Sequence, residues 1–327
     1  MKINKNIYLV FAALFAVTFL VSGCTQQTTT STTFVGGKDG LQTSFLTGNP
    51  PDSIYDGSNF VFAIIVRLNN AGESDIKSQD GYVSISGLDP ASFGIPTFQK
   101  NFPSDLRGTQ KNADGTKLGG DTATVEFGNL KYLPTIQGNI VSTVLADVCY
   151  KYSTRITSQI CIKNDPQQLT DVKICNTDGE TNPQNSGAPL QVTSLREYFA
   201  GQGKVGVTLT ISHVGSGDAF FKDTETKCDD TLSNPEKDRI LVTLKPVSIG
   251  GRQVTPQCLG LSDPVAQNKG YVLLARDSTN KASSQAITCI IDTSGTSSIF
   301  QVPVDAQLDY RYLQHIEVPI TIKHLAK

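Results

Sequence analysis

The sequence predicts an all-β chain that contains two copies of one β-sandwich domain. Two observations carry this prediction. From Gly40 onward, short strands with period-two hydrophobicity alternate with Gly, Pro, Asn and Asp turns, and two sequence blocks recur in the same order in each half. The length of 327 residues is consistent with about two domains, each large enough to bury its own core.

The overall composition excludes several classes of protein. Charged residues make up 18 % of the chain and the formal net charge is −2, so we expect no extended basic surface for nucleic acid. The hydrophobic fraction of 38 % is too high for a disordered chain, and it is too evenly spread for a protein with many membrane spans. The composition therefore favours a folded, exported chain.

The first 24 residues carry an attachment signal. Lys2 and Lys5 precede an apolar run over 7–21, and Val21-Ser-Gly-Cys24 closes it, a tract that resembles the lipobox of lipoproteins. We interpret residues 1–23 as a lipoprotein signal peptide and Cys24 as the first mature residue, carrying a diacylglyceryl group. The alternative is an uncleaved transmembrane helix. It needs ~20 apolar residues, and the run over 7–21 is shorter than that. Two acyl chains anchor a protein stably, so we expect attachment to the extracellular face of the cell membrane.

The folded domains are expected to follow a flexible segment. Residues 24–37 are rich in Thr, Ser and Gln and end in two glycines, which predicts a disordered tether. The chain has no Asn-x-Ser/Thr sequon, so N-glycosylation is not expected. We place the first sandwich at 38–165, a connector rich in Asn, Asp, Pro and Gln at 166–188, and the second sandwich at 189–327.

Two blocks support this division. Residues 147–163 align without a gap onto 307–323, and 68–75 aligns onto 211–218. Because the two blocks occur in the same order in each half, they indicate two copies of one domain type. The recurring residues include Tyr150 and Tyr310, Tyr152 and Tyr312, Gly72 and Gly215, and Asp75 and Asp218.

Each copy of the later block is interpreted as a hairpin that closes its sandwich. If the first hairpin is centred on residue 155, its tyrosines and isoleucines share an inner, apolar face. The same register places Cys149 opposite Cys161 on the outer face and predicts a disulfide between them. Both cysteines are replaced in the second copy, by Asp309 and Thr321, as expected for a bonded pair.

Four further cysteines complete an even set of six, which on an exported chain points to disulfides. Their spacing includes no CxxC, so neither a zinc site nor a thioredoxin-like site is expected. With Cys149–Cys161 assigned, three connectivities remain for the other four. Among these we favour Cys175–Cys228 and Cys258–Cys289.

The segment that follows one strand in each half resembles a known type of domain. Asn69-Asn-Ala-Gly-Glu-Ser-Asp75 and its copy are similar to the early-strand signature of the CARDB type of immunoglobulin-like domain, a cell-adhesion-related module. Asn49-Pro-Pro-Asp-Ser-Ile-Tyr-Asp-Gly57 and Val148-Cys-Tyr-Lys-Tyr152 are similar to segments of archaeal cell-surface lipoproteins. The resemblance covers most of 40–327 and implies two tandem immunoglobulin-like sandwiches at the cell surface, without an active site. The second copy departs from the pattern at His213, where the pattern has Asn.

Several motifs suggest chemistry but fit a structural interpretation better. The glycines in 201–206 match GxGxxG, yet they lead into a strand rather than a helix, so we expect a tight turn. Asn112, Asp114 and Asp121 loosely resemble a calcium loop, but no helices flank them and we expect a solvated turn. A second acidic stretch is interpreted in the same way; it contains Asp218, Asp223, Glu225, Asp229 and Asp230.

The histidines and tyrosines also lack a catalytic pattern. His213, His315 and His324 share no metal-ligand spacing, and the first two align with Asn70 and Arg155, where we expect turns. The four tyrosines of the repeat face inward in the predicted register, which favours core packing over a sugar-stacking platform. No nucleophile elbow and no pair of catalytic carboxylates can be placed, so no cofactor or metal is predicted.

We therefore predict a non-catalytic interaction, adhesion or envelope-structural module. It is expected to contact the membrane through the lipid on Cys24. Its strand edges and loops are expected to contact other surface proteins. This step rests on analogy at the level of the fold. Two alternatives stay open. One is a surface lipoprotein that binds sugar, peptide or calcium, with a concave site near Asp114 or Asp218; the other is an enzyme whose site is assembled across the two domains.

Overall fold

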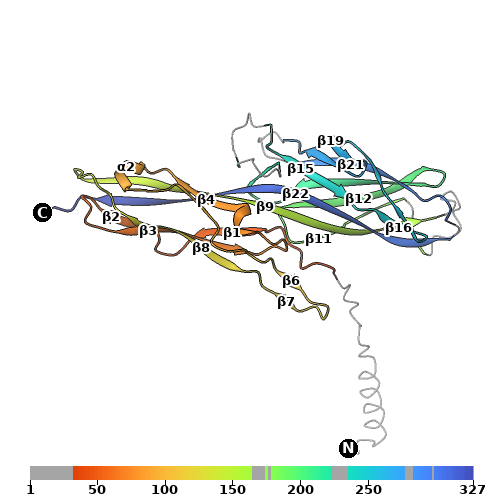
Figure 1. Ribbon diagram of the computed structural model, residues 1–327, viewed down its shortest axis with the longest axis horizontal. Helices are drawn as coiled ribbons and strands as arrows, with labels where there is room; N and C mark the ends of the chain where they lie inside the picture. The colour runs from red at the N-terminus through yellow and green to blue at the C-terminus, as the bar shows by residue number, and fades with distance from the viewer. Residues whose placement is uncertain are drawn as a thin grey trace, which may run out of the picture. The chain divides into compact units, whose positions relative to one another are not determined.

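Two strands of equal length form the centre of the molecule (Figure 1). β9 (Asn139–Ile162) and β22 (Phe300–Lys323) are antiparallel and pair over all 24 residues of each strand. At about 3.3 Å per residue, each strand spans about 80 Å. The strands are rich in Val, Ile, Tyr and Thr, residues that fit a pleated and half-buried surface. The paired strands therefore run through both halves of the folded body.

The computed structural model describes residues 32–163, 174–175, 178–221, 228, 235–276, 283–296 and 298–326. Residues Thr33–Lys327 form one compact unit. The predicted signal peptide (1–23) and the predicted lipidation site, Cys24, lie outside the described residues. Among the residues that are described, no helix has the length and hydrophobicity needed to cross a membrane.

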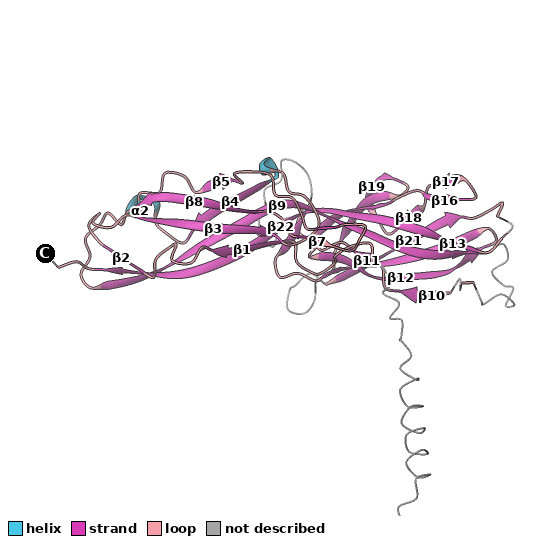
Figure 2. Ribbon diagram, turned by 90° about the horizontal axis from the view of Figure 1, so that it is seen from below, coloured by secondary structure: helices cyan, strands magenta, loops and turns pink. Residues whose placement is uncertain are grey.

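The first half of the chain forms a sandwich-like lobe around one end of the long strands (Figures 1 and 2). One layer has the strand order β1-β3-β8, from β1 (Leu41–Phe45), β3 (Phe62–Asn70) and β8 (Thr122–Leu130). The other layer joins β4 (Gly81–Ser86), β5 (Gln99–Asn101) and β2 (Ser53–Tyr55) to β9 and β22. The connections contain η1 (Ser78–Asp80), α2 (Pro90–Phe93) and a hairpin of β6 (Gln110–Lys111) and β7 (Lys117–Leu118).

The second half forms a lobe around the other end. One layer has the order β10-β12-β13-β21-β18, from β10 (Gly179–Thr181), β12 (Leu190–Gly201), β13 (Lys204–His213), β21 (Ser284–Asp292) and β18 (Gln257–Leu259). The other layer joins β15 (Arg239–Leu244), β20 (Lys269–Leu273) and β19 (Ser262–Ala266) to β22. The remaining strands are β11 (Gln184–Asn185), β14 (Asp218–Phe220), β16 (Val247–Ile249) and β17 (Arg252–Val254).

The internal repeat is visible in the strand pairing. The order β12-β13-β21 in the second lobe matches the order β1-β3-β8 in the first. β4 pairs with Val148 of β9, and β15 pairs with Leu308 of β22, two residues that the repeat aligns. The two copies of the later block, 147–163 and 307–323, pair with each other. An approximate twofold axis passes through the pair Lys151 and Arg311 and relates the two copies. Apart from η1 and α2, the regular structure of the described residues is β, as predicted.

The hairpins predicted within the two later blocks are wrong. The chain forms one continuous strand through residue 155, and another through residue 315. A turn centred on a residue and a continuous strand place the same alternate residues on the inner face, so hydrophobic periodicity does not distinguish them. The expected burial is confirmed: Val148, Tyr150, Tyr152, Ile160 and Ile162 are all in the core. Turn chemistry would have distinguished the two cases, because residues 148–163 contain no Gly, Pro, Asn or Asp.

Parts of the predicted tether and connector belong to the folded body. The backbone amides of Val35 and Gly36 donate hydrogen bonds to the Glu73 carboxylate, at 2.9 and 2.8 Å. The folded unit therefore begins at Thr33, earlier than the expected boundary at residue 38. Within the connector, β10 pairs with β12 and β11 pairs with β9.

Candidate functional site

Four tyrosines of the repeat meet at the centre of the long strands. Tyr150 pairs with Tyr312, and Tyr152 pairs with Tyr310. Neighbouring ring centroids lie 5.6 to 6.3 Å apart, and all four side chains are buried. Burial raises the pKa of each hydroxyl above its usual value of 10.0. The tyrosines are core residues, as predicted, and they do not form a sugar-stacking platform.

Each half brings a loop glycine against one of these tyrosines. A Cβ atom on Gly72 would lie 2.1 Å from the hydroxyl oxygen of Tyr152, and one on Gly215 would lie 2.3 Å from that of Tyr312. In each half, the backbone amide two residues after the glycine donates a hydrogen bond to the same hydroxyl, at 3.3 and 2.7 Å. The shared glycine of the repeat thus lets the loop approach the tyrosine.

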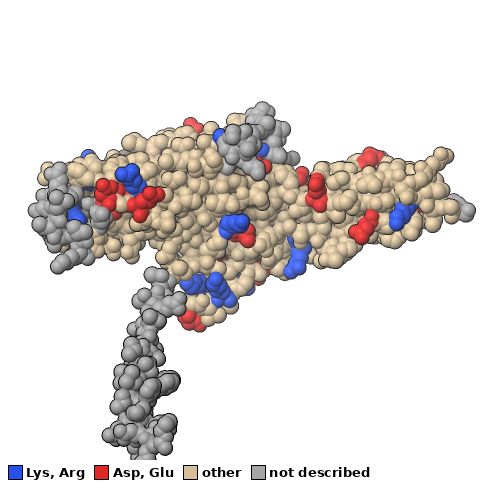
Figure 3. Space-filling model, turned by 180° about the vertical axis from the view of Figure 1, so that it is seen from behind, with Lys and Arg blue, Asp and Glu red and all other residues tan. Residues whose placement is uncertain are grey.

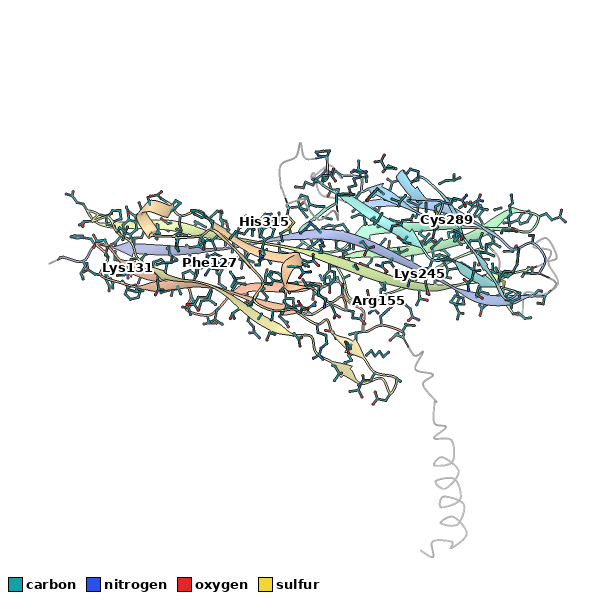
Figure 4. The ribbon with its side chains drawn as sticks, in the orientation of Figure 1. Phe127, Lys131, Arg155, Lys245, Cys289 and His315 are labelled. Atoms are coloured by element: carbon teal, nitrogen blue, oxygen red, sulfur yellow. A yellow bond between two sulfur atoms is a disulfide. The ribbon has the colours of Figure 1, made fainter. Side chains whose placement is uncertain are left out.

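A cavity of about 460 Å³ lies where the folded body begins. Its walls contain Thr33 and Phe34, the loop 73–75, residues 109–111, which include β6, and Arg155. The guanidinium of Arg155 lies 5.4 Å from the centroid of the Phe34 ring and donates to the carbonyl oxygen of Glu73 at 3.3 Å. Figure 4 shows Arg155 beside the middle of the long strands. We call this space the Arg155 cavity.

The two carboxylates in its wall bind backbone amides. Glu73, which is buried, accepts hydrogen bonds from the amides of Val35, Gly36 and Gly187 at 2.7 to 2.9 Å. Asp75 accepts one from the amide of Gly108 at 2.9 Å. Glu73 thereby ties the start of the folded body to the loop before β12. This role was not predicted, because the repeat aligns Glu73 with a serine. The only available signal was a charged residue within the shared block.

A second cavity, of about 310 Å³, occupies the repeat-equivalent place. Its wall contains Ser216, Gly217 and His315, which the repeat aligns with Glu73, Ser74 and Arg155 of the Arg155 cavity. The imidazole Nδ1 of His315 lies 2.7 Å from a carboxylate oxygen of Asp147 on β9. The alternative ligand site predicted near Asp114 or Asp218 is close in sequence to Lys111 and Gly217 in the two walls. Neither wall as a whole was predicted, because each combines loops and strands that are far apart in the chain.

The structure brings none of the three histidines together. His315 lies within β22, so the predicted turn there is wrong for the same reason as the hairpin. His213 is the last residue of β13, so the turn predicted there is also wrong. Its Nε2 lies 3.1 Å from the hydroxyl of Tyr312, and burial lowers its pKa. His324 Nδ1 lies 2.8 Å from the buried carboxylate of Asp56. This contact, together with two backbone amides, lowers the pKa of Asp56 to about 2.

The calcium-like segment is a solvated turn, as expected. It forms the β6–β7 hairpin, in which Asp114 accepts from the amide of Thr116 at 2.9 Å, and this lowers the pKa of Asp114. Asp121 pairs with Arg107 at 3.3 Å. Within the described part of the chain, no group of three or more His, Cys, Asp or Glu residues could hold a metal ion.

Of the second acidic stretch, the structure describes Asp218, whose carboxylate lies 3.3 Å from the ammonium of Lys237. Asp223, Glu225, Asp229 and Asp230 lie outside the described residues. The GxGxxG segment is a tight turn between β12 and β13, as predicted, with positive φ at Gly201 and Gly203. Neither cavity wall contains Asp218 or a residue of the GxGxxG segment.

Three disulfides join the six cysteines that were predicted to be bonded: Cys149–Cys228, Cys161–Cys175 and Cys258–Cys289. The last pairing is confirmed, and the other two predicted pairings are wrong. Cys149 and Cys161 lie on one strand, 12 residues apart. That separation is about 40 Å along a strand, whereas the Cα atoms of bonded cysteines lie within about 7 Å.

Glu197 on β12 was not predicted as a site residue either. Its Oε2 accepts a hydrogen bond from the amide of Cys161 at 2.9 Å, whereas Oε1 has no hydrogen-bond partner among the described residues. Burial raises the pKa of Glu197 to about 7. The sequence contained one signal for this buried carboxylate. Glu197 follows Leu195 by two residues, so in an alternating strand it points inward although it is charged.

The residues described above can bind and orient a ligand in two repeat-equivalent places. The Arg155 cavity offers a guanidinium beside an aromatic ring, and the second cavity offers an imidazole beside a carboxylate. The other charged side chains on the face in Figure 3 lie in small groups of both signs. Comparison of the chain with models of protein families and with curated proteins found no match.

Proposed function

We propose that the protein is a lipid-anchored cell-surface protein that acts as a non-catalytic interaction, adhesion or envelope-structural module, built from two immunoglobulin-like sandwiches. The observation that carries this proposal is the uninterrupted pairing of β9 with β22. Because the two lobes share these strands, they form a stiff body about 80 Å long rather than two domains on a hinge. Such a body is suited to hold a contact surface at a defined position.

Export and anchoring are supported by residues from two parts of the chain. Val21-Ser-Gly-Cys24 has the composition of a lipoprotein cleavage site. The three disulfides are typical of an oxidising compartment outside the cytoplasm. Glu73 binds the amides of Val35 and Gly36, so a force on the tether would reach the body where the two lobes join.

The proposed contact surfaces are exposed strand edges. β19 forms one edge of its sheet, all five of its residues are exposed, and its Val265 is 60 % exposed. An unpaired edge can accept a strand from a partner protein. The mixed charges in Figure 3 favour a protein partner over nucleic acid, because nucleic acid needs a continuous basic surface.

The anchor is tested by expressing the full chain and a Cys24→Ser variant in the same cells. We expect the wild type to fractionate with membranes and to have the mass of residues 24–327 with a diacylglyceryl group. The variant should be released or remain unprocessed, and both proteins should contain the same three disulfides. Retention of residues 1–23 on the wild type, without lipid, would contradict the proposal.

The role as a contact module is tested on intact cells with a cross-linker that does not cross membranes. We expect cross-links from the anchored protein to recur on the β19 edge, and a variant with Val265→Lys should lose them. Lys at a second exposed position, Leu118→Lys on the β6–β7 hairpin, is the matched control. Equal cross-linking by both variants would show that this edge is not the contact surface.

A second function, binding of a small ligand, is favoured by one observation, the Arg155 cavity. It places a guanidinium, hydroxyl groups and an aromatic ring around a space of about 460 Å³. Such convergence of polar groups is typical of ligand sites. Binding there is compatible with a role as a surface module.

A further inference from the structure

The two repeat-equivalent cavities differ in the charge that they present. In the second cavity, His315 is opposite Asp147 across the long strands, and the two side chains are in contact at 2.7 Å. In the first, Arg155 is opposite Gln307, which the repeat aligns with Asp147. The amide of Gln307 donates to Asp309 at 2.8 Å. The first cavity thus has the guanidinium of Arg155 at the place where the second has the imidazole of His315. It has Gln307 instead of the carboxylate of Asp147 that faces His315.

No other carboxylate in the described part of the chain replaces this missing partner. Arg155 donates one side-chain hydrogen bond, of 3.3 Å, to a backbone carbonyl, and it forms no ion pair with the described residues. Glu73 and Asp75 are nearby, but they accept hydrogen bonds from backbone amides. The exposed guanidinium therefore retains donors that face the cavity.

We propose that the Arg155 cavity binds one carboxylate group of a small ligand. A guanidinium presents two parallel N–H donors whose geometry matches a carboxylate. Ser74 and Gln110 in the wall can bind further polar atoms of the ligand, and Phe34 can cover an apolar face. The carboxylates of Glu73 and Asp75 share the wall with the cations of Arg155 and Lys111, so the site disfavours a dianion such as phosphate more than a monoanion. Sugar acids and peptide C-termini both carry the required group.

This inference does not depend on the lipid anchor or on the proposed role as a contact module. It is tested with the full, purified chain by ligand-observed NMR, using glucuronate, glucose, N-acetylglycine and inorganic phosphate as probes. We expect a Kd of about 1 mM for a carboxylate probe. Glucose and phosphate should bind at least about tenfold more weakly. Binding of glucuronate alone would identify a sugar acid, and binding of N-acetylglycine alone would identify a peptide terminus.

Two variants locate the site. Arg155→Gln should weaken carboxylate binding by about ten- to a hundredfold, because it removes the charged donors. Gln307→Asp restores the arrangement of the second cavity, places a carboxylate opposite Arg155, and should weaken binding without removing the arginine. The matched controls are Arg67→Gln, at an exposed arginine of β3, and Gln307→Asn.

The following results would overturn the proposal. Unchanged binding by both Arg155→Gln and Gln307→Asp would exclude this cavity. Glucose binding as tightly as glucuronate, or phosphate binding more tightly, would exclude a carboxylate as the recognised group. If no probe binds the wild type at about 100 mM, far above the expected Kd, the proposal also fails. The three disulfides and the melting temperature of each variant show whether it is folded.

Discussion

Gly72 and Tyr152 approach so closely that no side chain fits between them. A Cβ atom on Gly72 would lie 2.1 Å from the tyrosine hydroxyl oxygen, and it would also lie 2.4 Å from the carbonyl oxygen of Gly187. Gly215 and Tyr312 repeat this relationship in the second lobe. The two glycines of the repeat are therefore explained by packing rather than by an unusual backbone conformation.

This packing predicts that Gly72→Ala destabilises the protein. Because backbone atoms of Gly187 and Asp39 also crowd the position, the neighbours cannot move away easily, and we expect a loss of about 1–3 kcal/mol or more in the free energy of unfolding. Urea unfolding measures the loss. Gly119→Ala is the control, since no atom lies within 4 Å of its Cβ, and its effect should stay within about 0.5 kcal/mol. Equal effects of the two substitutions would contradict the packing argument.

Replacement of Glu73 should release the first residues of the folded body. Glu73→Ala leaves three buried or half-buried amides without an acceptor, so we expect a loss of about 2–5 kcal/mol and faster proteolytic cleavage near Val35. Limited proteolysis followed by mass spectrometry detects the cleavage. Glu126→Ala, at an exposed position on β8, should leave both properties unchanged. If cleavage is no faster in Glu73→Ala, Glu73 does not hold this segment.

The disulfides make a direct prediction about peptide mapping. Digestion of the non-reduced protein should yield linked peptides for Cys149–Cys228, Cys161–Cys175 and Cys258–Cys289. Removing Cys161–Cys175 by a double Ala substitution should lower stability by about 3 kcal/mol, because the bond closes a loop of 14 residues in the unfolded chain. A peptide that links Cys149 to Cys161 would show that the continuous strand is incorrect.

Glu197 predicts a dependence of stability on pH. Its pKa in the folded protein is about 7, above the usual 4.5, so the folded state binds the proton more tightly than the unfolded state does. The contribution of Glu197 to stability is therefore most favourable below pH 4.5 and is lost as the pH rises towards 7 and above, by at most about 3 kcal/mol.

Glu197→Gln should remove this part of the pH dependence and stabilise the protein at pH 8, because the amide carries no charge to desolvate. Urea unfolding of both proteins between pH 4 and pH 8 measures the difference. Glu126→Gln serves as the exposed control, and its curve should follow that of the wild type. Parallel curves for Glu197→Gln and the wild type would show that the carboxyl group titrates normally.

The predicted hairpin shows that hydrophobic periodicity identifies the buried residues of a strand but not the path of the chain. The alternation in 147–163 correctly placed Tyr150 and Tyr152 in the core, because side chains on a strand point to opposite faces in turn. It left open whether the chain folds back at residue 155 or continues into the second lobe, since both paths keep the same residues inside. The incorrect path led directly to the incorrect Cys149–Cys161 pairing.

The candidate site was harder to predict than the fold. Arg155 was noted only as the centre of the predicted hairpin and as the residue aligned with His315, and Glu73 only as part of a shared block. Their roles depend on Phe34 and on residues 109–111, which are distant in the chain and reach Arg155 only in the folded protein. No local pattern encodes such a convergence, because each residue is unremarkable within its own segment.

The amino-acid sequence alone was sufficient to predict the all-β class, the internal repeat and the inward direction of its tyrosines, because these properties follow from the local alternation of side chains and from the comparison of one segment with another. Only the tertiary structure decided which strands pair, and therefore which cysteines bond and which loops surround Arg155. The physical reason is that β9 and β22 gain their stability from each other, across more than a hundred intervening residues, and strand pairing over such a distance has no signature within either strand.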